Sequence, residues 1–242
     1  MNNNRMLSSV IYACLAAMLL VLACISPAQE QVIKGDGFLK QEQWDRAITA
    51  YTKAIELDPK LNAAGLNSKL TAAYTKRGYA YTSNGEPDKA IADFTRAIEL
   101  DPKYTAAYNY RGFTYGVMGY YDKAVADFTE AVELDPEFTL VYYNRGYLYN
   151  SNGEPDKAIA DFSRAIELDP KYALAYNNRG SVYVDMGDYD KAIADYTRSI
   201  EINPKLALAF YNRGYAYYKK GEYSKADADF KQAKELAYIV NP

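Results

Sequence analysis

The sequence contains no histidine, and both of its cysteines, Cys14 and Cys24, lie within the first 27 residues. Without histidine, the chain cannot form a Ser–His or Cys–His catalytic pair. Structural zinc sites require cysteine or histidine ligands, so residues 28–242 provide none, and no disulfide can form within them. These absences argue against an enzyme, and the sequence predicts no catalytic residue, no metal site and no cofactor.

The chain also lacks a strong charge of either sign. It has 28 lysines and arginines against 31 acidic residues, a net charge of −3. This balance disfavours nucleic acid as the main partner. The acidic residues lie on predicted helices that also contain lysine and arginine, which is typical of solvated helix faces. The cluster of Asp185, Asp188 and Asp190 does not follow the spacing of a calcium-binding loop.

Residues 1–27 have the features of an export signal, because a short polar start precedes an apolar run at residues 10–25. The stretch Leu20-Val21-Leu22-Ala23-Cys24 resembles a bacterial lipobox. Its use would make Cys24 the lipidated first residue of an exported protein held at the cell membrane. Two alternatives stay open. Cleavage after Ala28 would release the protein to the periplasm or the medium, and an uncleaved apolar run would itself anchor the chain.

A unit of 34 residues repeats through the rest of the chain. An Asp–Pro or Asn–Pro pair marks it, and the prolines follow one another at this interval: Pro102, Pro136, Pro170 and Pro204. We count positions 1 to 34 within each unit, with Thr105 at position 1. Most units have an aromatic residue at position 4, Gly at 8, Tyr at 11, Ala at 20, an aromatic residue at 24 and Pro at 32. A period of this length is typical of solenoids.

These positions predict pairs of helices. Positions 4, 8 and 11 fall on one face of a first helix, and positions 20, 24 and 27 fall on one face of a second. Gly at 8 and Ala at 20 permit close approach of the two helices, while the aromatic side chains fill the space around them. We expect a turn near positions 15–16 of each unit.

The pattern resembles the tetratricopeptide repeat family over Ala28 to Val240. The resemblance implies an all-α fold, a right-handed solenoid of six antiparallel helix pairs, whose usual activity is to bind another protein. The expected repeats, numbered 1 to 6 in order, are residues 28–61, 71–104, 105–138, 139–172, 173–206 and 207–240.

Repeat 1 departs from the pattern, and an insert at residues 62–70 follows it. Gln31 replaces the aromatic residue at position 4, and Gly37 weakens the first helix by about 1 kcal/mol relative to Ala. For the insert we expect a short helical turn, a loop, and then a helix capped by Asn67 or Ser68.

The two ends of the array carry polar substitutions. Positions 21 and 28 are aliphatic in repeats 1 to 5 but are Asp227 and Lys234 in repeat 6, and position 3 is Glu30 in repeat 1. Terminal repeats need a polar outer face to stay soluble. The sequence therefore predicts a solenoid that is complete at six repeats.

An arginine at position 7 accompanies an aspartate at position 23 in repeats 2 to 6, whereas repeat 1 has Lys34 and Ala50. A guanidinium group can bind a carboxylate through two parallel hydrogen bonds. We expect each arginine to contact an aspartate between packed helices, within a repeat or between neighbours.

Aromatic and asparagine side chains recur at positions 5, 9 and 12, which line the concave surface in the family. The candidate partner-binding residues are Tyr79, Asn109, Phe113, Tyr143, Tyr147, Asn150, Asn177, Tyr211, Tyr215 and Tyr218. Tyrosine provides a large contact area with few rotamers to freeze. We expect Tyr143, Tyr147, Tyr211 and Tyr215 to lie exposed along one strip. In the alternative interpretation, the position-9 tyrosines fill space between repeats.

The sequence thus predicts an exported, non-enzymatic scaffold that binds an extended segment of a protein or peptide in its concave groove. The alternative is a carbohydrate or cell-wall binding module that uses the same tyrosines and asparagines. A subset of the family clamps a C-terminal carboxylate with groove lysines. Positions 5 and 9 of repeats 2 to 6 contain no lysine or arginine, which argues against that activity.

Overall fold

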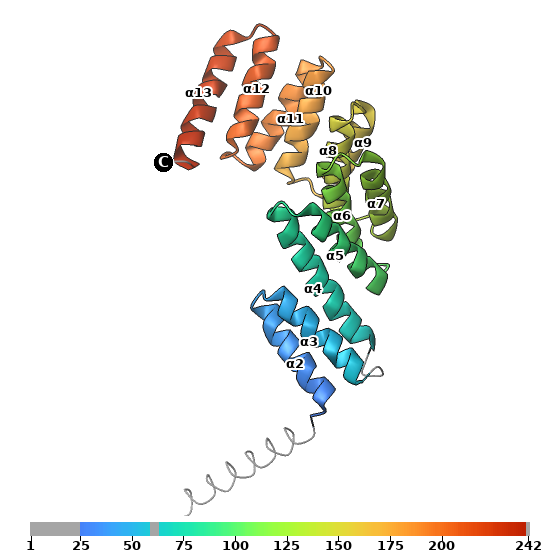
Figure 1. The fold of residues 1–242 in the computed structure, drawn as a ribbon. Coiled ribbons are helices and arrows are strands. Elements are labelled where there is room, and N and C mark those ends of the chain that lie inside the picture. Colours follow the sequence, from blue (N-terminus) through green and yellow to red (C-terminus); the bar gives the residue numbers. More distant parts are fainter. Residues whose placement is uncertain (1–24, 59–62, 241–242) are drawn as a thin grey trace, which may run out of the picture. The chain divides into compact units, whose positions relative to one another are not determined.

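The computed structural model describes residues 25–58 and 63–240, with side chains at 25–58 and 65–236. All regular structure in these residues is helical (Figure 1). The helices are α2 (Pro27–Lys40), α3 (Trp44–Leu57), α4 (Ala63–Ser83), α5 (Pro87–Leu100), α6 (Thr105–Val117), α7 (Tyr121–Leu134), α8 (Thr139–Ser151), α9 (Pro155–Leu168), α10 (Ala173–Asp185), α11 (Tyr189–Ile202), α12 (Ala207–Lys219) and α13 (Tyr223–Val240). Residues 1–24, which include Cys24 and most of the predicted signal of residues 1–27, lie outside the described residues. None of the described helices is long and apolar enough to cross a membrane.

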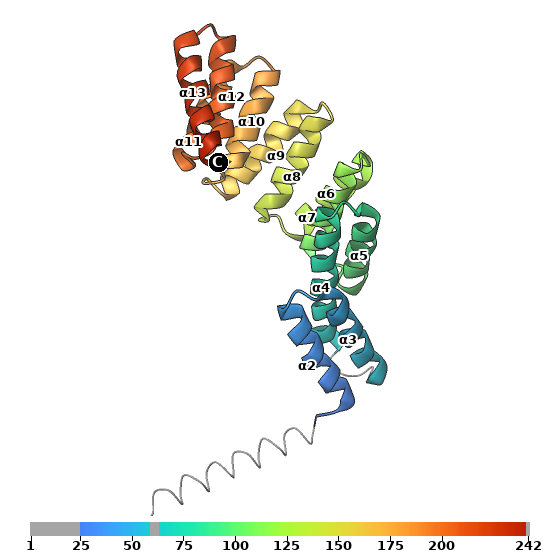
Figure 2. The ribbon, with the colours of Figure 1, turned by 60° about the vertical axis from the view of Figure 1, so that its left-hand side comes forward.

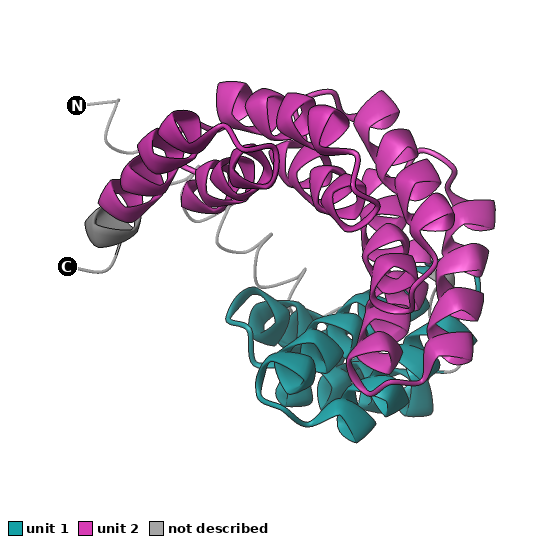
Figure 3. Cartoon of the chain, turned by 90° about the horizontal axis from the view of Figure 1, so that it is seen from above, with its two compact units in different colours: residues 1–104 teal, residues 105–242 magenta. Residues whose placement is uncertain are grey.

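The helices of the described residues form six pairs, as the sequence predicts, and the pairs fall into two compact units (Figure 3). The unit of residues 1–104 contains the pairs α2–α3 and α4–α5. The unit of residues 105–242 contains α6–α7, α8–α9, α10–α11 and α12–α13, and Figure 2 shows these pairs from a second side. The all-α fold of repeated helix pairs is therefore confirmed.

A tight turn joins the two helices of each pair at position 15. In repeats 2 to 6 this position is a glycine with φ between 75° and 80°, a conformation that costs glycine little. In repeat 1 it is Glu42, with φ 59°. The glycine at position 8 also has a specific role, because a Cβ atom at Gly146 would lie 3.1 Å from the ring of Phe162. The expected close crossing of the paired helices is confirmed.

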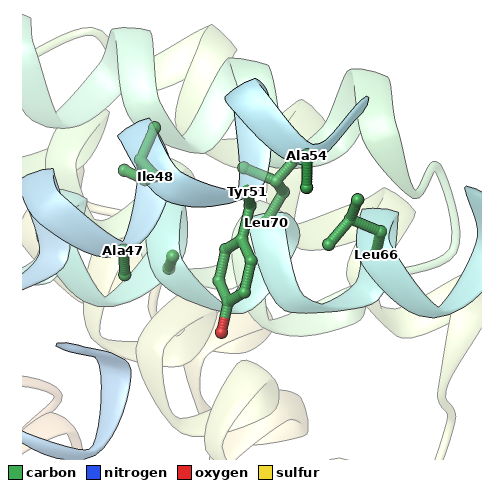
Figure 4. Close-up of a cluster of buried hydrophobic side chains, with 7 residues drawn as sticks. Ala47, Ile48, Tyr51, Ala54, Leu66 and Leu70 are labelled. Carbon is green, nitrogen blue, oxygen red and sulfur yellow. The ribbon is translucent and has the colours of Figure 1, made fainter. Parts of the chain in front are cut away.

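The predicted loop within the insert is wrong. Helix α4 runs without a break from Ala63 to Ser83, through Gly65 and past Asn67 and Ser68. Leu66 and Leu70 lie one turn apart on α4 and are buried against Tyr51 and Ala54 of α3 (Figure 4).

The physical reason is tertiary burial. Each buried leucine contributes about 1.5–3 kcal/mol, which exceeds the cost of about 1 kcal/mol for one glycine in a helix. An ion pair also fixes this segment, since Lys69 Nζ lies 2.7 Å from Asp36 Oδ2 on α2. The insert thus lengthens the first helix of repeat 2 and packs it onto repeat 1.

Within residues 105–242, the first helices of successive pairs contact one another: α6 with α8, α8 with α10 and α10 with α12. The second helices make no comparable contacts with one another within this part of the described chain, and each packs instead on the next first helix. These contacts place the first helices on the inner side of the unit, whose curve is drawn in magenta in Figure 3.

Candidate partner-binding surface

Position 9 places aromatic side chains in solvent on the first helices. Tyr147 on α8 is 58% exposed, and Phe113 on α6 and Tyr215 on α12 are also exposed. Tyr79 is exposed at the same position of α4, in the other unit. Because these rings are not packed between repeats, the interpretation of the position-9 tyrosines as space-filling residues does not apply to them.

Position 5 behaves differently, and here the sequence prediction needs correction. Asn109 and Asn177 are only 1% exposed. Asn144 Nδ2 donates to Asn109 Oδ1 at 2.9 Å, and Asn212 Nδ2 donates to Asn177 Oδ1 at 3.1 Å. Each donor stands at position 6 of the following repeat, so the next first helix covers position 5. These two asparagines join repeats and offer no surface to a partner.

Tyr143 is also held between repeats and is only half-exposed. Asn178, at position 6 of the next repeat, donates to its hydroxyl oxygen at 3.0 Å. Its ring packs 5.0 Å from the ring of Tyr172 and 5.9 Å from that of Phe162, measured between centroids. This burial raises the pKa of Tyr143. The expectation of a fully exposed Tyr143 is wrong.

Tyr211 stands at position 5 of repeat 6, where no following helix of the described residues covers it. It is 56% exposed, and its ring lies 5.5 Å from that of Phe230. It lines a hollow of about 620 Å³ at the end of repeat 6, together with Ala207, Leu208, Phe230, Ala233 and Lys234. Tyr211 thus belongs to this end face rather than to the row of position-9 rings.

Position 12 contributes one exposed ring. Tyr218 is exposed and makes an edge-to-face contact with Tyr223, at 5.5 Å between centroids, whereas Asn150 is half-exposed.

At position 9 of repeat 5 stands Ser181, which accepts a hydrogen bond from the Tyr196 hydroxyl at 3.1 Å. Within residues 105–242, the exposed position-9 rings are therefore Phe113, Tyr147 and Tyr215, with a small residue between the last two.

Sequence reasoning missed an apolar turn in repeat 3. Val117 is 69% exposed and Tyr120 is also exposed, at the turn between α6 and α7. The other repeats have mostly polar or charged residues there, such as Ser151 and Glu154 in repeat 4. The signal was present in the sequence as a contrast between repeats at positions 13 and 16.

The expected arginine–aspartate contacts are confirmed, and they lie within each repeat. Arg145 Nε is 2.7 Å from Asp161 Oδ2, and its Nη2 is 2.9 Å from Oδ1. The same two bonds form in the pairs Arg77–Asp93, Arg111–Asp127, Arg179–Asp195 and Arg213–Asp229. The hydrogen bonds to Asp161 raise the pKa of Arg145. These arginines are engaged in holding helices together and are not free to bind a ligand.

One further polar cluster links the internal turn of repeat 3 to the internal turn of repeat 4. Tyr121 donates a hydrogen bond to Glu154, and Lys157 pairs with the same carboxylate. Lys157, Tyr121 and Asn152 together lower the pKa of Glu154 to about 2. In the described part of the chain, no group of three acidic, histidine or cysteine side chains is arranged to hold a metal ion.

Comparison with known proteins agrees with this fold. Tetratricopeptide repeat models match residues 33–61, 71–104, 140–172, 162–194 and 207–238, and a TPR repeat model matches 118–153 and 180–221. No curated protein sequence matches the chain.

Solved structures with the same fold include MamA, YrrB and PilW. MamA is 32% identical, with a TM-score of 0.61 over 70% of this chain and 92% of its own. YrrB, described as a TPR protein with an unusual peptide-binding site, is 27% identical, with a TM-score of 0.58 over 77% and 92%. PilW, described as a type IV pilus biogenesis factor, is 25% identical, with a TM-score of 0.65 over 70% and 78%.

Proposed function

Because the chain belongs to the tetratricopeptide repeat family, we propose that it is a non-enzymatic scaffold that binds an extended protein segment along its first helices. The observation that carries this proposal is the exposure of Phe113, Tyr147 and Tyr215 at one repeat position on the inner side of residues 105–242. The peptide-binding site reported for YrrB, which shares the fold, supports it.

Aromatic stacking and hydroxyl hydrogen bonds provide the binding energy in this proposal. Tyr147 and Tyr215 offer both a ring face and a hydroxyl group. Ser181, a small residue, stands at the same position on the intervening helix. The position-7 arginines are held by aspartates, so this proposal does not use them to bind the segment.

Selection from a displayed random-peptide library tests the proposal without a known partner. Peptides selected on the wild-type protein should bind the double variant Tyr147→Ala/Tyr215→Ala much more weakly, since such anchors typically contribute about 2 kcal/mol or more each. The matched control is Leu57→Ala, which removes an exposed apolar side chain from the second helix α3. The helical circular dichroism of both variants should equal that of the wild type.

Three outcomes would contradict the proposal. Unfolding of the double variant would mean that the rings are core. A folded variant that still binds would place the peptide elsewhere, for example at Val117 and Tyr120. Retention on a glycan array that depends on Tyr147 and Tyr215, with no peptide selected, would establish the carbohydrate alternative.

We also propose that the protein is exported as a lipoprotein through Cys24, on the strength of its lipobox-like sequence. The change Cys24→Ser should abolish incorporation of labelled palmitate and release the protein from the membrane fraction. Labelling that survives the change would disprove lipidation, and a mature N-terminus at Gln29 would indicate simple secretion.

A further inference from the structure

Two internal turns of the chain have the same sequence but different surroundings. The stretches Ser83–Phe94 of repeat 2 and Ser151–Phe162 of repeat 4 are identical residue for residue. Each contains an Asn–Gly pair at its turn, and both asparagines, Asn84 and Asn152, are exposed. Because the local sequence is the same, a difference in the chemistry of the two asparagines comes from the contacts that the fold supplies.

An asparagine followed by glycine can lose its side-chain amide. The backbone nitrogen of the glycine attacks Cγ of the asparagine, the bond from Cγ to Nδ2 breaks, and Nδ2 leaves as ammonia with the proton of the glycine amide. Water then opens the cyclic imide to aspartate or isoaspartate. Glycine favours this reaction because it has no Cβ atom beside the attacking nitrogen and adopts a wide range of backbone conformations.

The backbone is alike in the two turns. Gly85 and Gly153 have φ of 75° and 77°. Their amides donate to the carbonyl oxygens of Thr82 and Asn150, at 3.2 Å and 3.1 Å. The attacking nitrogens of the two turns are therefore held in the same way, and the backbone gives neither asparagine an advantage.

The side chain of Asn152 is held by a contact that reaches into the preceding repeat. Asn152 Nδ2 donates to Glu154 Oε1 at 3.0 Å. Tyr121 of repeat 3 donates to the same carboxylate oxygen, and Lys157 Nζ lies 2.5 Å from Glu154 Oε2. A hydrogen bond to a charged acceptor is stronger than one between neutral groups. Asn152 therefore has to break a charge-assisted bond before its Cγ can turn toward the next nitrogen.

The side chain of Asn84 has no such restraint. Within the described part of the chain, no residue forms a hydrogen bond with it. Glu86 pairs with Lys89, as the corresponding residues do in repeat 4. At the position of Tyr121, however, repeat 1 has Trp44, which has no hydroxyl group. The Asn84 side chain is thus free to turn toward the Gly85 nitrogen.

We propose that Asn84 is a site of spontaneous deamidation, and that Asn152 is protected within the same sequence by Glu154 and Tyr121. The loss of one net hydrogen bond corresponds to a rate about three- to tenfold lower at Asn152. The product at Asn84 carries a new negative charge directly after the last residue of α4, where the helix macrodipole disfavours it. The proposal uses none of the exposed position-9 rings, so it is independent of the proposed peptide binding.

Incubation of the purified full-length protein in neutral buffer, followed by tryptic digestion and mass spectrometry, tests the proposal. Trypsin releases the two turns in peptides of different mass, Gly78–Lys89 and Gly146–Lys157, and fragment ions distinguish Asn152 from Asn150. In the folded chain, Asn84 should convert about three- to tenfold faster than Asn152. In the chain denatured with guanidinium, which is the matched control, the two should convert at the same rate.

The variant Tyr121→Phe tests the source of the protection. It removes the hydroxyl that fixes Glu154 but keeps the ring, so conversion of Asn152 should rise toward that of Asn84 in the same molecule. Tyr189→Phe, the same change at the same position of repeat 5, should leave both rates unchanged. Helical circular dichroism should show that both variants are folded.

Equal rates at the two asparagines of the folded chain would overturn the proposal. So would faster conversion of Asn152, which would mean that Glu154 promotes the attack instead of restraining it. If Asn84 of the folded chain stays intact for as long as the denatured chain needs to convert it, the backbone turn protects both sites and the proposal fails. A slow Asn152 in folded Tyr121→Phe protein would overturn the role given to Tyr121.

Discussion

Repeat 1 and repeat 4 are copies of one unit, yet different polar contacts join their helices. In repeat 4, Arg145 of α8 binds Asp161 of α9 through two hydrogen bonds. Repeat 1 lacks both residues. There the hydroxyl of Tyr51 on α3 donates to Asp36 Oδ1 on α2 at 2.8 Å. Burial and this carboxylate raise the pKa of Tyr51 well above its usual range.

In both repeats a polar contact joins the two helices of the pair, but the residues that form it differ. In repeat 1, Asp36 also binds Lys69 of α4, so the contact extends to the insert in repeat 2. In repeat 4, Arg145 Nη1 reaches Thr129 of the preceding repeat at 3.5 Å. Both repeats are thus joined internally, but the polar contact of repeat 1 extends to the helix that follows it, whereas that of repeat 4 extends to the helix before it.

The largest effect should come from breaking the internal pair of repeat 4. Arg145→Ala leaves Asp161 buried without its partner, which should cost about 3 kcal/mol. The corresponding change in repeat 1, Lys34→Ala, removes an exposed side chain and should cost less than about 0.5 kcal/mol. Urea unfolding of the two variants measures the difference in free energy of unfolding, and hydrogen exchange of the amides in α8 and α9 shows whether the loss is in repeat 4.

A double-mutant cycle on Arg145 and Asp161 separates their coupling from the cost of truncation. We expect a coupling well above 1 kcal/mol. A value of about 0.3 kcal/mol or less would match exposed ion pairs and would mean that repeats 1 and 4 do not differ in this respect.

A smaller effect on stability is expected when a large side chain replaces a glycine of a first helix. Gly146→Leu should cost about 1–3 kcal/mol, because its Cβ already meets the ring of Phe162 at 3.1 Å. Gly37→Leu in repeat 1 has open space around the new Cβ and should instead stabilise α2 by up to about 1 kcal/mol through helix propensity. Thermal unfolding of the two variants compares them, and equal destabilisation would contradict the packing described for position 8.

The smallest effect concerns the turn of repeat 1. Glu42 adopts φ 59° where the other repeats have glycine, a conformation that is strained for a residue with a side chain. Glu42→Gly should stabilise the protein by roughly 0.5 kcal/mol, whereas the reverse change Gly153→Ala in repeat 4 should destabilise it by about 1 kcal/mol. Chemical denaturation measures both, and opposite signs are the expected result.

Much of the helix pairing could be predicted because it depends on contacts within one repeat. Gly146 and Phe162, or Arg145 and Asp161, lie in the same 34-residue unit, so their recurrence reveals the contact. The insert could not be predicted in this way, since it occurs once. Gly65 and Asn67 favoured a break, and only the burial of Leu66 and Leu70 on α3 favours a continuous helix.

The candidate partner-binding residues also divide into those that could be predicted from one repeat and those that depend on contacts between repeats. The sequence placed positions 5 and 9 on one helix face, one turn apart, and treated them alike. The exposure of Tyr147 follows the prediction, but Tyr143 and Asn177 are covered by asparagines of the next repeat. Whether a position faces solvent or a neighbour depends on how closely successive first helices approach, which no single repeat encodes.

By itself, the sequence determined the period, the helix pairs, the glycine turns and the arginine–aspartate contacts. All of these are set by spacings along one chain segment, where helix geometry converts sequence separation into contact. Only the tertiary structure decided that α4 is continuous, that position 5 is an interface between repeats, and that the end of repeat 6 presents an apolar hollow at Tyr211. These features depend on the burial of one repeat by another, because the free energy of an apolar surface is set by what covers it.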